Sequence, residues 1–167
     1  QLVELGVEEE KIIHFFDLHK IPEIRNTRKP VCYYGGAEEL ILKPDTDRKK
    51  IVLLSQDMTL GGPAIALFHA AEILKQQGYQ VVFGSMLDGP LKEMLLEAGI
   101  PVVVDVNLQI ETMRENDWVR HFSLIVCSTI HFYVFLSDRA CTVPAVWWLH
   151  DSLFFYDGVD RQCLKQM

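Results

Sequence analysis

One stretch of this chain, residues 51–83, constrains its fold more than any other. It begins with a short, continuous apolar run at 51–55, as in a strand that is buried on both faces of a parallel sheet. A glycine turn follows, and residues 63–77 then place apolar side chains at helical spacing, before a second apolar run at 79–83. Because the helix carries the chain back, the pattern predicts two parallel strands joined by a helix.

The turn between the first strand and the helix has the features of an anion site. Gly61 and Gly62 have no side chains to keep a ligand away from the backbone, and Pro63 suits the first position of a helix. The helix start presents free N–H groups and the positive end of the helix dipole. The alternative is that the two glycines only make a tight turn.

Strands and helices continue to alternate along the rest of the chain. Three further strands are predicted at 101–104, 122–127 and 144–148, and three further helices at 91–98, 107–118 and 128–137. The alternation predicts an α/β fold with a doubly wound parallel, Rossmann-like sheet, its five strands in the order 3-2-1-4-5.

Ligands of such sheets bind outside the carboxyl ends of the strands, where the strand order reverses. In the predicted order this point lies between the first and fourth strands. We therefore expect the loops at 56–62, 128–131 and 149–152 to form one crevice.

The first 47 residues differ from the rest. Residues 3–18 have helical spacing, and the remainder of the segment is rich in turn residues. We expect residues 1–47 to form a helical extension outside a main domain at 48–167, or an arm that binds a partner. The D-x-D string at 45–47 is interpreted as a solvated loop rather than a metal ligand.

Composition excludes several classes of function. The net charge of -7 argues against a nucleic-acid partner and against a basic membrane-binding patch. No apolar run approaches the roughly 20 residues that span a bilayer, and the acidic N-terminus does not have the pattern of a signal peptide. The four cysteines form no C-x-x-C pair and are expected to be reduced thiols in a cytoplasmic protein. The histidines lack metal-ligand spacing, so we expect neither a metal site nor a cofactor.

Three common catalytic or nucleotide-binding motifs are absent. The glycine turn does not fit G-x-G-x-x-G, and no acidic residue ends the second strand, which argues against a dehydrogenase. The chain also contains no Walker loop and no G-x-S-x-G nucleophile elbow.

The pattern resembles the N-terminal domain of a family-4 glycosyltransferase of the two-domain GT-B type. The resemblance covers about residues 50–152 and rests on the order of six pieces: 51–57, 60–64, 74–81, 88–91, 98–102 and 143–151. It implies two facing Rossmann-like domains, of which the first binds mainly the acceptor and the second binds most of the nucleotide-sugar donor.

The resemblance also implies roles for individual residues. The turn of Gly61, Gly62, Pro63 and Ala64 would lie near the donor diphosphate, and His150 would face the reacting sugar. Such enzymes need no bound metal. Because the 167 residues lack a second domain, we expect this acceptor-side half to be inactive alone. The resemblance leaves room for peripheral membrane contact by the full-length protein.

Each candidate residue has a structural alternative. His150, the predicted catalytic residue, could instead close the end of a strand, and Asp57 could be a turn acceptor rather than a ligand of the acceptor. Thr129 and Asp151 are predicted to bind substrate from the other two loops, with His131 a weaker candidate. A second class of function stays open: an α/β interaction module that keeps the fold without the chemistry.

Overall fold

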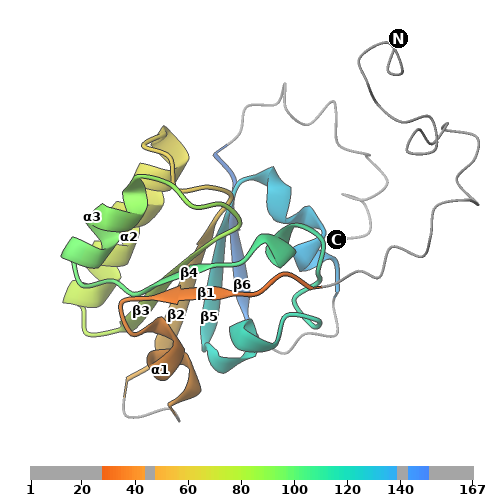
Figure 1. Cartoon of the computed structure of the whole chain (residues 1–167), viewed down its shortest axis with the longest axis horizontal. Coiled ribbons are helices and arrows are strands. Elements are labelled where there is room, and N and C mark those ends of the chain that lie inside the picture. The colour runs from red at the N-terminus through yellow and green to blue at the C-terminus, as the bar shows by residue number, and fades with distance from the viewer. Residues whose placement is uncertain (1–27, 44–47, 139–142, 151–167) are drawn as a thin grey trace, which may run out of the picture.

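The computed structural model describes residues 28–43, 48–138 and 143–150, which are drawn in colour in Figure 1. Within these residues six strands form one sheet in the order β1-β4-β3-β2-β5-β6. The strands are β1 (Cys32–Tyr34), β2 (Lys50–Ser55), β3 (Gln80–Ser85), β4 (Val102–Val104), β5 (Leu124–Ser128) and β6 (Ala145–Trp148). The α-helices are α1 (Ala37–Leu42), α2 (Gly62–Gln76) and α3 (Leu91–Glu97). Short 3-10 helices are η3 (Val106–Gln109), η4 (Asp117–His121), η5 (Ile130–Tyr133) and η6 (Phe135–Ser137).

Five of the six strands are parallel, and they are the five that the sequence predicts. From β4 to β6 they lie in the predicted order, since β2 is the first predicted strand and is flanked by β3 and β5. The prediction does not match the whole sheet, because it missed β1, which pairs antiparallel with β4 at the edge. Its three residues precede two glycines and look like part of a turn, and only pairing with β4 makes them a strand.

The segment just before β2 belongs to the sheet and its core. α1 buries Ala37 and Ile41 in one of the two core clusters. The buried Lys50 ammonium donates to the carbonyls of Ile41, at 3.3 Å, and of Lys43, so the end of α1 is fastened to the start of β2. Residues 32–42 therefore pair with the sheet and contribute to its core, while the domain boundary at residue 47 stays a prediction. The helix predicted at 3–18 and the string at 45–47 lie outside the described residues.

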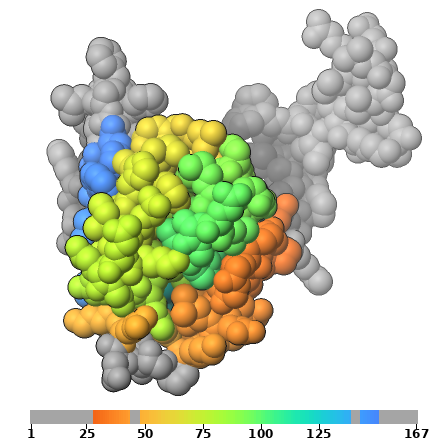
Figure 2. All heavy atoms as spheres, turned by 90° about the vertical axis from the view of Figure 1, so that its left-hand side faces the viewer, coloured from red at the N-terminus to blue at the C-terminus, as the bar shows by residue number. Residues whose placement is uncertain are grey.

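Two apolar clusters cover the two faces of the sheet. α2 and α3 lie together on one face, where they pack on Leu53 and Phe83, among others (Figure 1). α1 and the 3-10 helices cover the other face, where Leu54 and Trp118 are buried. Figure 2 looks onto the face of α2 and α3, with residues 28–43 in orange along one border and 143–150 in blue along the other. All six residues of β2 are buried, as its continuous apolar run predicts.

Two predicted helices are replaced by short 3-10 turns. Where one helix was expected at 107–118, η3 and η4 stand apart. The buried Asp105 carboxylate explains the interruption, because it accepts from the Asn107 backbone N–H (3.0 Å), Asn116 Nδ2 (3.0 Å) and Trp118 Nε1 (2.8 Å). A side chain that binds nearby backbone in this way competes with regular helix. The helix expected at 128–137 is likewise η5 and η6.

The close contact between β2 and β3 gives the first testable prediction. A Cβ added at Gly84 would lie 2.5 Å from Leu54 Cδ2 and 3.0 Å from Trp118 Cη2. We expect Gly84→Ala to destabilise the fold by about 1–3 kcal/mol, as overpacking of a core does. For a chain of this size that lowers Tm by roughly 2–12 °C in a thermal melt. Gly62→Ala is the control, because nothing lies within 4 Å of its added Cβ; equal Tm values for the two variants would contradict the packing.

Candidate functional site

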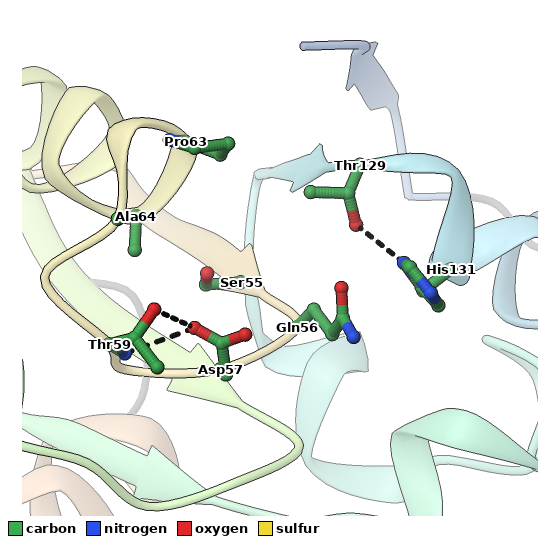
Figure 3. A pocket seen from close by; sticks show the side chains of 9 residues that line it. Ser55, Gln56, Asp57, Thr59, Pro63, Ala64, Thr129 and His131 are labelled. Atoms are coloured by element: carbon green, nitrogen blue, oxygen red, sulfur yellow. Dashed lines mark hydrogen bonds between the residues drawn. The ribbon is translucent and has the colours of Figure 1, made fainter. Parts of the chain in front are cut away.

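A pocket of about 320 Å³ lies at the carboxyl ends of β2 and β5. This is the point where the strand order reverses, as the sequence predicts, and the volume suits a small ligand. Figure 3 shows the loop after β2 on one side and the loop after β5 on the other. The lining residues are Ser55, Gln56, Asp57, Thr59, Gly61, Pro63, Ala64, Thr129 and His131.

The N-terminus of α2 forms one wall of the pocket. Gly61 is the N-cap in extended conformation, and no side chain caps the helix or places an acid in its first turn. An added Cβ at Gly62 would meet nothing within 4 Å, so the backbone there is open to approach. Gly62 is not one of the lining residues, whereas Gly61, Pro63 and Ala64 are. This helix start therefore presents free N–H groups and the positive end of the helix dipole to an anion in the pocket.

Asp57 faces the pocket and also shapes the loop that carries it. Its Oδ1 accepts from the Thr59 backbone N–H (3.0 Å) and from Thr59 Oγ1 (2.6 Å). These bonds are those of an Asx turn, the structural alternative that the sequence left open. The Asp57 carboxylate is therefore fixed in place within the pocket wall (Figure 3).

Thr129 has the most unusual backbone in the site. Its φ of 75° and ψ of 162° fall where side chains are disfavoured, and it is the one non-glycine residue with positive φ among those described. Two groups of β6 hold this backbone: the Thr129 N–H donates to the Trp148 carbonyl (3.3 Å), and Trp147 Nε1 donates to the Thr129 carbonyl (2.7 Å). Such strain is found where the surrounding structure fixes a functional loop.

His131 projects into the pocket from the start of η5. Its ring is exposed, and its Nδ1 lies 3.4 Å from Thr129 Oγ1. In Figure 3 the ring lies across the pocket from Asp57 and Thr59, with Gln56 between the two sides. The weaker of the two histidine candidates thus lines the pocket.

His150 lies beside the pocket rather than in its lining. Its ring centroid is 4.4 Å from the ring of Trp148, whose carbonyl accepts from Thr129. The Nε2 atom is buried and has no hydrogen-bond partner among the described residues. Asp151, the next predicted site residue, lies outside the described residues. The roles assigned to both residues stay predictions.

Sequence reasoning placed Gln56 and Thr59 in the crevice loop at 56–62 without giving either a role, and it left out Ser55. Ser55 ends β2 and Gln56 follows it. The signal for both was a polar residue at the end of an apolar strand that lies at the switch point. For Thr59 the signal was its position two residues after Asp57, which is the spacing of an Asx turn.

Two reactive groups of the core, Asp105 and Cys127, are closed to ligands. The oxygens of the buried Asp105 are already bonded to backbone, amide and indole donors. Burial raises the pKa of the Cys127 thiol far above its ordinary value, so this sulfur stays a protonated, inert core group. Residues 28–43, 48–138 and 143–150 contain no cluster of three potential metal ligands and no helix long and apolar enough to cross a bilayer.

Comparison with known proteins decides the family. A family model described as glycosyl-transferase family 4 matches residues 47–166. The chain belongs to glycosyltransferase family 4. The resemblance inferred from the sequence is thereby confirmed, and the match covers β2, α2 and the whole pocket of this family-4 domain. No curated protein and no solved structure gave a significant match.

The strained backbone of Thr129 gives the second testable prediction. At this position glycine should be more stable than alanine by up to about 2.5 kcal/mol, because glycine relieves a strain of about 1–3 kcal/mol at an entropy cost of only about 0.5–1 kcal/mol. Thermal melts of Thr129→Gly and Thr129→Ala measure this difference. Both variants lose nearly the same side-chain packing, so the loss cancels when they are compared.

Ser128 supplies the matched control pair. It is fully buried, it precedes Thr129, and it has an ordinary strand backbone. Ser128→Ala should therefore be more stable than Ser128→Gly by about 0.5–1 kcal/mol. The same order, alanine above glycine, at position 129 would show that Thr129 is unstrained.

Proposed function

We propose that this domain is the acceptor-side half of a nucleotide-sugar-dependent glycosyltransferase that transfers a sugar to a hydroxyl acceptor. The proposal is carried by one observation: in a family-4 domain, the pocket at the switch point is bounded by the uncapped start of α2. An anionic leaving group is what this wall would stabilise.

The transfer requires few groups from this chain. The acceptor oxygen forms a bond to the anomeric carbon, the bond from that carbon to the leaving phosphate oxygen breaks, and the hydroxyl proton is released. The N–H groups of Gly61, Gly62 and Ala64 are proposed to face the diphosphate, while Asp57, Thr129 and His131 orient the acceptor. Positioned donors that face developing charge are commonly worth about 2.7–4 kcal/mol in a transition state.

We further propose that turnover needs a second Rossmann-like domain, which binds most of the donor and closes the pocket. Half of a two-sided crevice neither aligns both substrates nor excludes water, and alignment carries much of the rate. The proposal includes a cytoplasmic location and allows peripheral membrane contact by the full-length protein.

One observation favours the alternative, an interaction module without chemistry: His150, the proposed catalytic residue, does not line the pocket. Binding of a nucleotide sugar to this chain would favour the transferase, because the interaction module needs no nucleotide-sugar site.

The third prediction tests the proposed ligand on the chain itself. Titration with UDP-, GDP- and ADP-linked sugars, followed by amide NMR, should shift the signals of Gly61, Gly62 and Ala64 for at least one of them. Gly62→Leu should abolish these shifts, because its side chain would cover the open helix start. His69→Leu is the control, since it adds the same side chain at an exposed position of α2 away from the pocket. Wild-type protein that shows no shift with any of these sugars would overturn the proposed diphosphate site at the start of α2.

The fourth prediction concerns His150 in the enzyme that carries both domains. His150→Ala should lower kcat at least tenfold and leave Tm nearly unchanged, because a histidine that donates to a sugar hydroxyl or to a developing negative charge acts in the transition state. A transfer assay and a thermal melt on the same preparation provide both values. A His150→Ala variant that keeps full kcat, or loses activity only as it unfolds, would make the residue structural.

A further inference from the structure

Strand β6 contacts a pocket residue through Trp147, which does not itself line the pocket. Trp147 is half-buried and packs against the core cluster of α1 and the 3-10 helices. Its indole N–H reaches out of that cluster and donates to the Thr129 carbonyl at 2.7 Å. Core packing alone does not need this bond, because the ring would fill the same space without it.

The Trp147 bond is made to Thr129, the residue with the strained backbone. Thr129 is 6% exposed and holds a backbone conformation in which a threonine is strained, at φ 75°. Without an external hold, its carbonyl and N–H would relax toward an ordinary conformation. The Trp147 indole binds the Thr129 carbonyl and the Trp148 carbonyl binds the Thr129 N–H, so β6 holds the two peptide groups that flank the Thr129 Cα.

His131 lies next to the held side chain of Thr129. Thr129 Oγ1 is 3.4 Å from His131 Nδ1, and both side chains line the pocket (Figure 3). With Nδ1 turned toward Thr129, the ring presents Nε2 as its remaining hydrogen-bonding atom. No hydrogen bond to Nε2 is found among the described residues.

We propose that Trp147 is a positioning residue of the sugar-transfer pocket: its indole N–H holds Thr129 in the strained conformation from which Thr129 orients His131 toward the bound substrate. The proposal rests on the proposed function for the identity of the ligand. The chain Trp147–Thr129–His131 itself is a property of the free protein. It makes strand β6 a determinant of pocket geometry although no β6 side chain lines the pocket.

The test is the ring spectrum of His131 in the free 167-residue chain, recorded as long-range ¹H–¹⁵N correlations of the histidines. Trp147→Phe keeps an aromatic ring in the core, removes the indole N–H and makes the ring smaller, a loss of volume that the control below shares. It should shift the His131 ring signals and the Thr129 amide signal. Trp118→Phe is the matched control, because it makes the same change of ring and removes an indole hydrogen bond of similar length. That bond, 2.8 Å long, goes to Asp105 and not to the pocket. It should leave the His131 signals in place. An unchanged His131 spectrum in Trp147→Phe overturns the proposal.

A second pair of variants decides the case in which Trp147→Phe does not fold. Thr129→Ser keeps the hydroxyl and should retain the wild-type His131 signals, whereas Thr129→Gly removes the hydroxyl and should shift them. Equal His131 spectra in these two variants overturn the proposal.

Ligand binding then separates this inference from the proposed function. If a nucleotide sugar binds the wild type, Trp147→Phe should weaken its Kd by about 2- to 12-fold, the worth of one neutral hydrogen bond, and Trp118→Phe should leave Kd unchanged. Unchanged affinity in Trp147→Phe overturns the role toward substrate. If no nucleotide sugar binds the wild type, the proposed diphosphate site at the start of α2 fails, and the ligand-free spectra alone decide whether Trp147 orients His131.

Discussion

The structure depends on the pairing of β2 with parallel neighbours on both sides. β2 pairs with β3 along six residues and with β5 along four, and every one of its side chains is buried. A strand in this position cannot slip by one residue, because a slip would exchange the side chains of two different cores. The register therefore fixes Ser55 and the loop after it at the carboxyl edge of the sheet, and with them the start of α2.

The pocket is a consequence of this edge. Both connections from β2 to β3 and from β3 to β4 pass over one face through α2 and α3, so the chain reaches β5 on the other side of β2. The loops after β2 and β5 diverge from there and leave a pocket between them, which is lined in part by the polar side chains of both loops. Rigid strand ends thus present groups that a loop alone would not hold at fixed distances.

The two sides of the pocket are supported differently. On the β2 side, Asp57 and Thr59 brace each other within three residues of chain. On the β5 side, Thr129 and His131 depend on β6, which lies some twenty residues further along the sequence. The bonds between Asp57 and Thr59 are local, so a small movement of the sheet leaves them intact. The bonds from β6 to Thr129 instead pass a movement of β6 on to the loop after β5. The β5 side is therefore where changes at the sheet edge would alter a ligand's contacts.

The sequence by itself determined the five parallel strands, their order, the helix that opens at Gly61 and the edge where the pocket lies. These follow from apolar runs and glycine turns, which are local signals that burial in a parallel sheet leaves unaltered. Tertiary structure decided the rest. β1 became a strand only by pairing with β4, and the expected helix at 107–118 gave way to the bonds of the buried Asp105. The choice of His131 over His150 in the pocket lining was also tertiary, because both histidines follow strand ends in the sequence and only the folded loops show which of them lines the pocket.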